Sequence, residues 1–157
     1  MRVGKYAIVH GVEHRALFGP SNEDIDLVIP RDHPRPEGYR WYDGMGGFWY
    51  KTVPRSAAQR LFSVVTWALY KEKFPVLLYS LDPGGKATVF YHVATSPVQF
   101  SRDPEDENGD LLVPEGFHMM GNQEGWSARV DLADLTDVLE KVTEHPLEPE
   151  PHRRHEW

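Results

Sequence analysis

The chain repeats one order of apolar and polar residues. The stretch "GGFWYKTVPRSAAQRLFSVVT" at residues 46–66 returns as "EGWSARVDLADLTDVLEKVT" at residues 124–143. The aligned pairs are Trp49 with Trp126, Val53 with Val130, Phe62 with Leu139, Val65 with Val142 and Thr66 with Thr143. Self-similarity that keeps one order along the chain indicates repeated supersecondary units.

The match extends upstream of these stretches. Residues 5–10 align with residues 66–71, residues 15–18 with 76–79, and residues 25–29 with 89–93. Each aligned pair keeps its apolar pattern, so the sequence predicts that one unit of structure has been duplicated.

Local patterns predict what each unit contains. Residues 6–10 and 14–18 are rich in apolar side chains and flank Gly11, which indicates a hairpin. Further strands are expected at residues 25–29, 49–53 and 62–68, the last running from the first unit into the second. Pro54 suits the first position of a short helix. Asp131 is a candidate N-cap for a helix, because the apolar residues of "LADLTDVLEKV" have helical spacing.

This order of hairpin, strand, strand, short helical turn and strand resembles an SH3-like small β-barrel. The expected fold is therefore mainly β with short helices, built from two tandem SH3-like repeats at residues 1–66 and 67–146. A flexible tail rich in proline and charge is expected at residues 147–157. The alternative is a single α+β domain with one mixed sheet and two helices. A small barrel is marginally stable alone, so a fused pair would gain by burying a common face.

Composition narrows the partners. The 157 residues include no cysteine, which excludes disulfides and thiolate metal sites and suits the cytoplasm. The formal net charge is −7 and no basic stripe appears, so we expect no nucleic-acid partner and favour a basic protein surface. Polar residues interrupt every apolar run, so neither a signal peptide nor a membrane span is expected.

Two inserts between the predicted third and fourth strands are the candidate binding loops, since long loops are often functional. The first, residues 30–47, carries Tyr39, Trp41 and Tyr42 among glycines. Tyrosine and tryptophan are typical anchors of protein interfaces, so we expect these rings to bind a partner. The alternative is that they cover the end of the barrel, as most aromatic residues are buried.

The second insert, residues 94–125, is acidic. The predicted partner-binding residues in it are Asp103, Glu105, Asp106, Glu107, Phe117 and Met119. A calcium loop counted from Asp103 would need glycine at its sixth position and glutamate at its twelfth. Those positions hold Asn108 and Pro114, so no metal site is predicted.

No catalytic signature is present. The eight histidines form no HExxH pattern, and the sequence holds no GxSxG, P-loop or GxGxxG motif. We therefore assign no catalytic residue and no cofactor.

One fragment, "VFYHVATS" at residues 89–96, resembles a strand motif of ADP-ribosyltransferase-like enzymes. That resemblance implies that Tyr91, His92 and Thr95 surround NAD and that Glu140 is the catalytic glutamate. The motif normally opens its domain, and no serine-threonine-serine motif follows it here. A related alternative is a ligand site at the repeat junction that would also use His10 and Trp67.

The favoured reading is a non-enzymatic binding protein. The opening "GKYAIVHG" and the unit W-x-x-x-V-P-x-S…L-F-x-V-x-T resemble small actinobacterial proteins encoded as immunity partners of secreted toxins. The resemblance implies inhibition by occlusion, with the aromatic loop buried in a basic toxin and the acidic loop speeding association.

Overall fold

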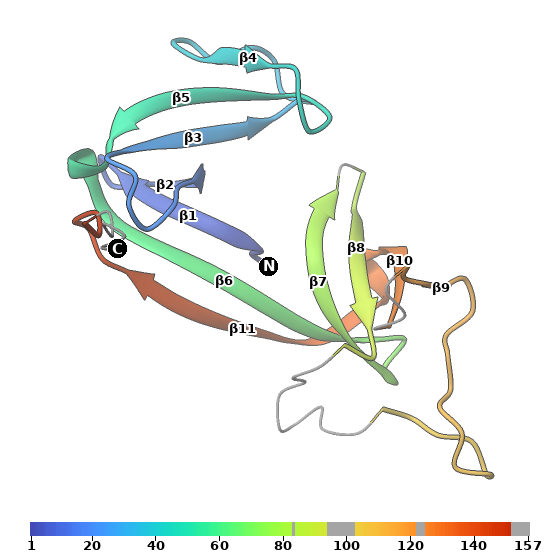
Figure 1. Cartoon of the computed structure of the whole chain (residues 1–157). Coiled ribbons are helices and arrows are strands. Elements are labelled where there is room, and N and C mark those ends of the chain that lie inside the picture. Colours follow the sequence, from blue (N-terminus) through green and yellow to red (C-terminus); the bar gives the residue numbers. More distant parts are fainter. Residues whose placement is uncertain (83, 94–102, 122–124, 152–157) are drawn as a thin grey trace, which may run out of the picture. The chain divides into compact units, whose positions relative to one another are not determined.

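The computed structural model describes residues 1–82, 84–93, 103–121 and 125–151, which form a mainly β protein (Figure 1). Its strands are β1 (Gly4–Val9), β2 (Val12–Leu17), β3 (Asp24–Pro30), β4 (Arg40–Tyr42), β5 (Phe48–Pro54), β6 (Ala58–Tyr70), β7 (Phe74–Asp82), β8 (Lys86–Tyr91), β9 (His118–Met119), β10 (Trp126–Asp131) and β11 (Leu135–His145). Single 3-10 turns, η1 (Arg55–Ala57) and η3 (Leu132–Asp134), precede β6 and β11. The prediction of a mainly β fold is confirmed.

The chain divides into two compact units. The N-terminal unit comprises Gly4–Val64 and Val142–Trp157, and the C-terminal unit comprises Met1–Val3 and Val65–Lys141. The first half of β6 therefore belongs to one unit and its second half to the other.

The two units share one strand order. It is β4-β5-β3-β2-β1-β6 in the N-terminal unit and β9-β10-β8-β7-β6-β11 in the C-terminal unit. In the C-terminal unit, β6 takes the place that β1 holds in the N-terminal unit, and η3 takes the place of η1. Every strand pair with a defined register is antiparallel, so a mixed sheet is not formed by the described residues.

The predicted first hairpin is confirmed. β1 pairs with β2 from Tyr6 opposite Arg15 to Val9 opposite Val12. The turn residues His10 and Gly11 have φ of 51° and 75°. Two residues with positive φ form the kind of turn whose twist matches that of the strands beside it. The predicted strands at residues 25–29 and 49–53 are also confirmed, as parts of β3 and β5.

The α+β alternative is wrong, because no α-helix occurs in the described ranges. The short helical turn expected after Pro54 is present as the 3-10 turn η1, but strand β6 begins directly after it. The helix expected after Asp131 is wrong, because only the 3-10 turn η3 forms there and strand β11 follows. In "LADLTDVLEKV" the apolar spacing misled, because Val138 and Val142 are exposed while Leu135 is buried. β-branched residues favour the extended strand β11, which gains its hydrogen bonds by pairing with β6.

Each unit has its own core. That of the C-terminal unit gathers around the fully buried Val76, Val89 and Tyr91. That of the N-terminal unit gathers around Ile25 and Leu61. No helix of the described residues is long and apolar enough to cross a membrane.

The residues after β11 begin as an ordered segment. The carbonyl oxygen of Leu147 accepts a 3.1 Å hydrogen bond from Nε of Arg55, and the amide of Glu150 donates to the carbonyl oxygen of Pro20 at 2.7 Å. The sequence placed the start of a flexible tail here. Residues 152–157 of that tail lie outside the described residues.

Candidate functional site

The first insert forms an edge strand. β4 pairs with β5, with Trp41 opposite Trp49 and Tyr42 opposite Phe48. It is the last strand in the order of the N-terminal unit and lies beside β5 alone, as Figure 1 shows in cyan. All residues of β4 are exposed.

This pairing exposes aromatic rings on both faces of the edge strand, Trp41 with Trp49 on one face and Tyr42 with Phe48 on the other. We call Trp41, Tyr42, Met45, Phe48 and Trp49 the aromatic edge. The Trp41 ring meets Trp49 edge-on at 4.9 Å between centroids, and the Tyr42 ring lies 5.0 Å from that of Phe48. Trp49 is fixed in turn, because its Nε1 donates a 3.1 Å hydrogen bond to the carbonyl oxygen of His33. Trp41 and Tyr42 remain 44% and 45% exposed, and Met45 is 84% exposed.

Glycines allow the rings to lie against the backbone. A Cβ on Gly47 would come 2.4 Å from Cζ2 of Trp41, and one on Gly44 would come 2.6 Å from Cε1 of Tyr42. The Gly47 amide also donates a 2.9 Å hydrogen bond to the carbonyl oxygen of Gly44. The glycines of the insert therefore leave room for the rings against the backbone, while contacts with Trp49 and Phe48 set the ring positions.

The second insert contains a short hairpin-like turn that is rich in acidic residues. We call residues 103–111 the acidic hairpin. Glu105 bridges Leu111, and the amide of Asp106 donates to the carbonyl oxygen of Asp110 at 2.8 Å. Oδ1 of Asp106 accepts hydrogen bonds from the main-chain amides of Asn108 and Asp110 at 2.8 and 2.9 Å. The Asp106 carboxylate thus shapes the turn, whereas Glu105, Glu107 and Asp110 are exposed.

Two of the predicted partner-binding residues lie in the cores. Tyr39 is 8% exposed and packs in the N-terminal unit, as the barrel-covering alternative predicts for that ring. Phe117 is 9% exposed, and its ring lies 5.3 Å from that of Tyr70. Met119, two residues on, is 57% exposed on β9. Burial therefore leaves Trp41, Tyr42 and Met119 as the accessible apolar residues of the predicted set.

His92 does not continue strand β8, contrary to the sequence prediction. It follows Tyr91 with φ of 56°, a left-handed conformation that ends the strand. Its Nδ1 lies 2.5 Å from Oδ2 of Asp103, and its ring lies 5.9 Å from that of Trp126. The side chain of His92 is half exposed, so it ties the start of the acidic hairpin to the sheet.

The residues of the NAD-site resemblance are not gathered around an accessible space in the described part of the chain. Tyr91 is fully buried, and its hydroxyl donates a 2.7 Å hydrogen bond to the carbonyl oxygen of Leu112. Burial and the charge of Asp103 raise the pKa of Tyr91. Thr95 lies outside the described residues. Glu140 is on strand β11 and not on the predicted helix, with its Oε2 3.1 Å from Nε of Arg2.

The junction alternative adds two residues from different units. His10 is exposed in the turn of the N-terminal unit, and Trp67 is 7% exposed in the C-terminal unit. The junction site stays a prediction.

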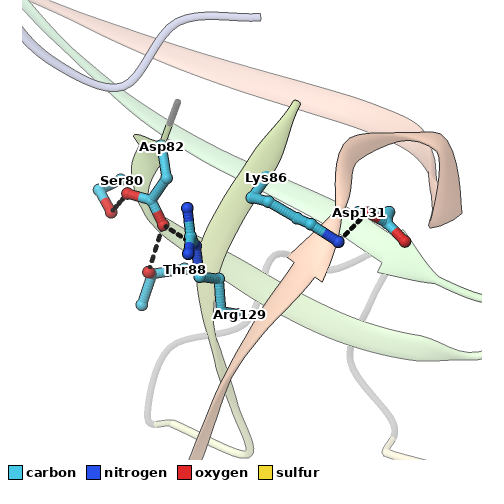
Figure 2. Close-up of polar contacts among 6 residues, drawn as sticks. All are labelled: Ser80, Asp82, Lys86, Thr88, Arg129 and Asp131. Carbon is cyan, nitrogen blue, oxygen red and sulfur yellow. Dashed lines mark hydrogen bonds and ion pairs between the residues drawn. The ribbon is translucent and has the colours of Figure 1, made fainter. Parts of the chain in front are cut away.

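A polar network that the sequence analysis missed lies on β7, β8 and β10 (Figure 2). Asp82 accepts hydrogen bonds of 2.8 Å from the hydroxyls of Ser80 and Thr88, and its Oδ2 lies 3.4 Å from Nε of Arg129. Lys86 pairs with Asp131, the residue opposite it on β10. These charges satisfy one another, so the network joins the strands and offers no open reactive group.

Comparison with protein-family models, with curated proteins and with solved structures gives no match to this chain.

Proposed function

We propose that this chain is a non-enzymatic binding protein that inhibits a basic protein by covering it, in the manner of an immunity protein acting on a toxin. The aromatic edge is the observation that carries the proposal. Tryptophan and tyrosine are the residues that most often dominate interface energies. Here Trp41 and Tyr42 are exposed yet held by Trp49, Phe48 and the flanking glycines.

The acidic hairpin supplies the second part of the proposal. Exposed Glu105, Glu107 and Asp110 stand on a turn shaped by Asp106, in a chain of net charge −7. Carboxylates at an interface act mainly on the rate and specificity of association with a positive surface. A basic partner is therefore favoured, and its association should slow as salt rises.

The duplication belongs to this proposal as well. We infer that the two units are tandem SH3-like repeats, because their strand orders correspond and a 3-10 turn precedes the last strand of each. A duplicated scaffold can keep its cores while its inserts diverge. One insert here became aromatic and the other acidic, and loops are where such scaffolds carry function.

The NAD-site alternative has less support. It requires Tyr91 to meet a ligand, but that side chain is fully buried and its hydroxyl is bonded to Leu112.

The test is capture from the native cell at low salt, with Trp41→Ala/Tyr42→Ala as the variant. We expect one basic protein to be captured by the native chain and lost with the double variant. The activity of the captured protein should also fall when the native chain is added.

Tyr79→Ala is the matched control. Tyr79 is 64% exposed and stacks on Phe90 in the C-terminal unit. The substitution therefore removes an exposed aromatic ring that lies outside the aromatic edge. This control should capture as the native chain does. Equal capture by the double variant would show that the aromatic edge is not the binding surface.

A further inference from the structure

The inner face of the N-terminal unit carries charge among apolar residues. Directly paired residues of neighbouring strands share one face of a sheet. Lys51 is opposite Leu27, and Leu27 is opposite Ala16, so Lys51 lies on the face of these core residues. His14, two residues before Ala16 on β2, lies on that face too and is opposite the buried Ala7.

A groove of about 490 Å³ opens on this face. Its apolar lining includes Val9, Val12, Leu27, Tyr39, Val53 and Ala57. His10, His14 and Lys51 are its titratable lining residues besides Tyr39. Small-molecule sites are commonly hollows of this size, mostly apolar, with a few convergent polar groups.

The electrostatics of the groove favour an anion. Lys51 brings an ammonium group to the groove. Burial, and then the charge of Lys51, lower the pKa of His14, and burial raises the pKa of the Tyr39 hydroxyl. Among the described residues, neither Lys51 nor His14 forms an ion pair or a side-chain hydrogen bond, and the groove has no acidic lining residue. The Lys51 ammonium therefore lies beside apolar lining residues, and no carboxylate among the described lining residues neutralises its charge.

We propose that this groove binds a small apolar molecule carrying one carboxylate. The carboxylate pairs with Lys51, and the apolar body covers Leu27 and Val53. A single lysine ammonium matches a monoanion, and the histidine nitrogens can add hydrogen bonds to the same group. The site shares no residue with the aromatic edge, so it stands or falls independently of the proposed inhibitor function.

Octanoate is the probe, with octan-1-ol as its uncharged counterpart, and calorimetry on the full chain is the measurement. We expect octanoate to bind more tightly than octan-1-ol. Lys51→Met should weaken octanoate about tenfold, or about 1.4 kcal/mol, and leave octan-1-ol unchanged. Lys73→Met, at an exposed lysine outside the groove, should bind octanoate as the native chain does.

Two further measurements exclude simple misfolding. Lys51→Glu should prefer octylamine to octanoate while still binding octan-1-ol, which an unfolded chain would not do. In the native chain, octanoate should raise the pKa of His14, followed by its ring proton in NMR, because a carboxylate favours the charged imidazolium.

Failure of octanoate to bind the native chain, or equal binding by Lys51→Met, would overturn the proposal. The C-terminus of a protein chain could offer the same carboxylate beside apolar side chains. Comparing a peptide that ends in two leucines and a free carboxylate with the same peptide as its amide tests that source. Binding of the peptide acid without binding of octanoate would also overturn the proposal and assign the groove to a chain terminus.

Discussion

Nη2 of Arg55 donates a 2.8 Å hydrogen bond to the carbonyl oxygen of Pro146, at the far end of the chain. Its other nitrogens reach the carbonyl oxygens of Gly19, Asn22 and Leu147 at 2.8, 3.2 and 3.1 Å. Arg55 is only 2% exposed. A guanidinium can be buried in this way because its donors fan out in one plane and each meets an acceptor.

Arg55→Met should therefore destabilise the protein by about 3 kcal/mol, because hydrogen bonds from a charged donor are lost and buried carbonyl oxygens are left without partners. Arg55→Lys should recover only part of this loss, since one ammonium cannot reach all the carbonyl oxygens. Urea unfolding monitored by circular dichroism measures the free energies.

Arg60→Ala is the control for removing an arginine. The Arg60 guanidinium pairs with Glu144 in the same unit, but both side chains are exposed to solvent. We expect a much smaller loss than for Arg55→Met. Equal losses would mean that the buried carbonyl contacts of Arg55 contribute nothing specific.

Arg55 also shows where sequence reasoning stops. Hydrophobic patterns and the turn at Gly11 sufficed for the first hairpin and for the strands β3 and β5, because those signals are local. The acceptors of Arg55 are main-chain oxygens, which leave no mark in the sequence. The apolar spacing after Asp131 predicted a helix, whereas the segment forms a strand that pairs with β6, a contact distant in sequence.

The candidate surface was predictable only in part. Composition marked the aromatic insert, but Tyr39, Trp41 and Tyr42 are alike in type and neighbourhood. What separates them is the pairing of β4 with β5, which exposes Trp41 and Tyr42, while Tyr39 packs in the core. Burial of this kind depends on contacts with strands distant in sequence.

The glycines of the aromatic insert give a sharp test of how Trp41 is held. Gly47→Ala would drive a methyl group into the Trp41 ring and should alter the near-ultraviolet circular dichroism of the Trp41–Trp49 pair. It should also weaken partner capture. Gly46 has a similar φ, 80° against 85°, but a Cβ there meets nothing within 4 Å.

Gly46→Ala is therefore the matched control. Both variants should lose about 1 kcal/mol of stability from the left-handed backbone, because alanine is strained there. Only Gly47→Ala should change the spectrum. A matching change in Gly46→Ala would mean that the loop backbone, and not contact with the ring, sets the position of Trp41.

His14 should make stability depend on pH. Burial and the charge of Lys51 lower its pKa in the folded chain, while His10 and Tyr39 share the groove. The unfolded chain therefore takes up a proton first as pH falls below about 6.5, and the free energy of unfolding decreases.

Replacing His14 with glutamine should remove this part of the pH dependence. As the pH is lowered from 7.5 to 5.0, the free energy of unfolding of His14→Gln should increase relative to that of the native chain. Urea unfolding at each pH measures both free energies. A relative stability that is the same at both values would show that His14 does not resist protonation in the folded chain.

The network in Figure 2 separates a shared carboxylate from an isolated ion pair. Asp82 is 21% exposed and accepts from Ser80, Thr88 and Arg129 together, so Asp82→Ala should cost about 2 kcal/mol of stability. Asp131→Ala removes only the ion pair with Lys86. The side chains of Lys86 and Asp131 are 42% and 55% exposed, so this variant should lose less than about 1 kcal/mol of stability. Urea unfolding of both variants gives the comparison.

Raising the salt concentration should reduce the stability loss of Asp131→Ala more than that of Asp82→Ala. Salt screens the attraction between Asp131 and Lys86, but it does not screen the hydrogen bonds from hydroxyl groups to Asp82. If the two losses were equal at low salt, Asp82 would act as an ordinary surface charge and the hydroxyl contacts would add nothing to the joining of β7 and β8.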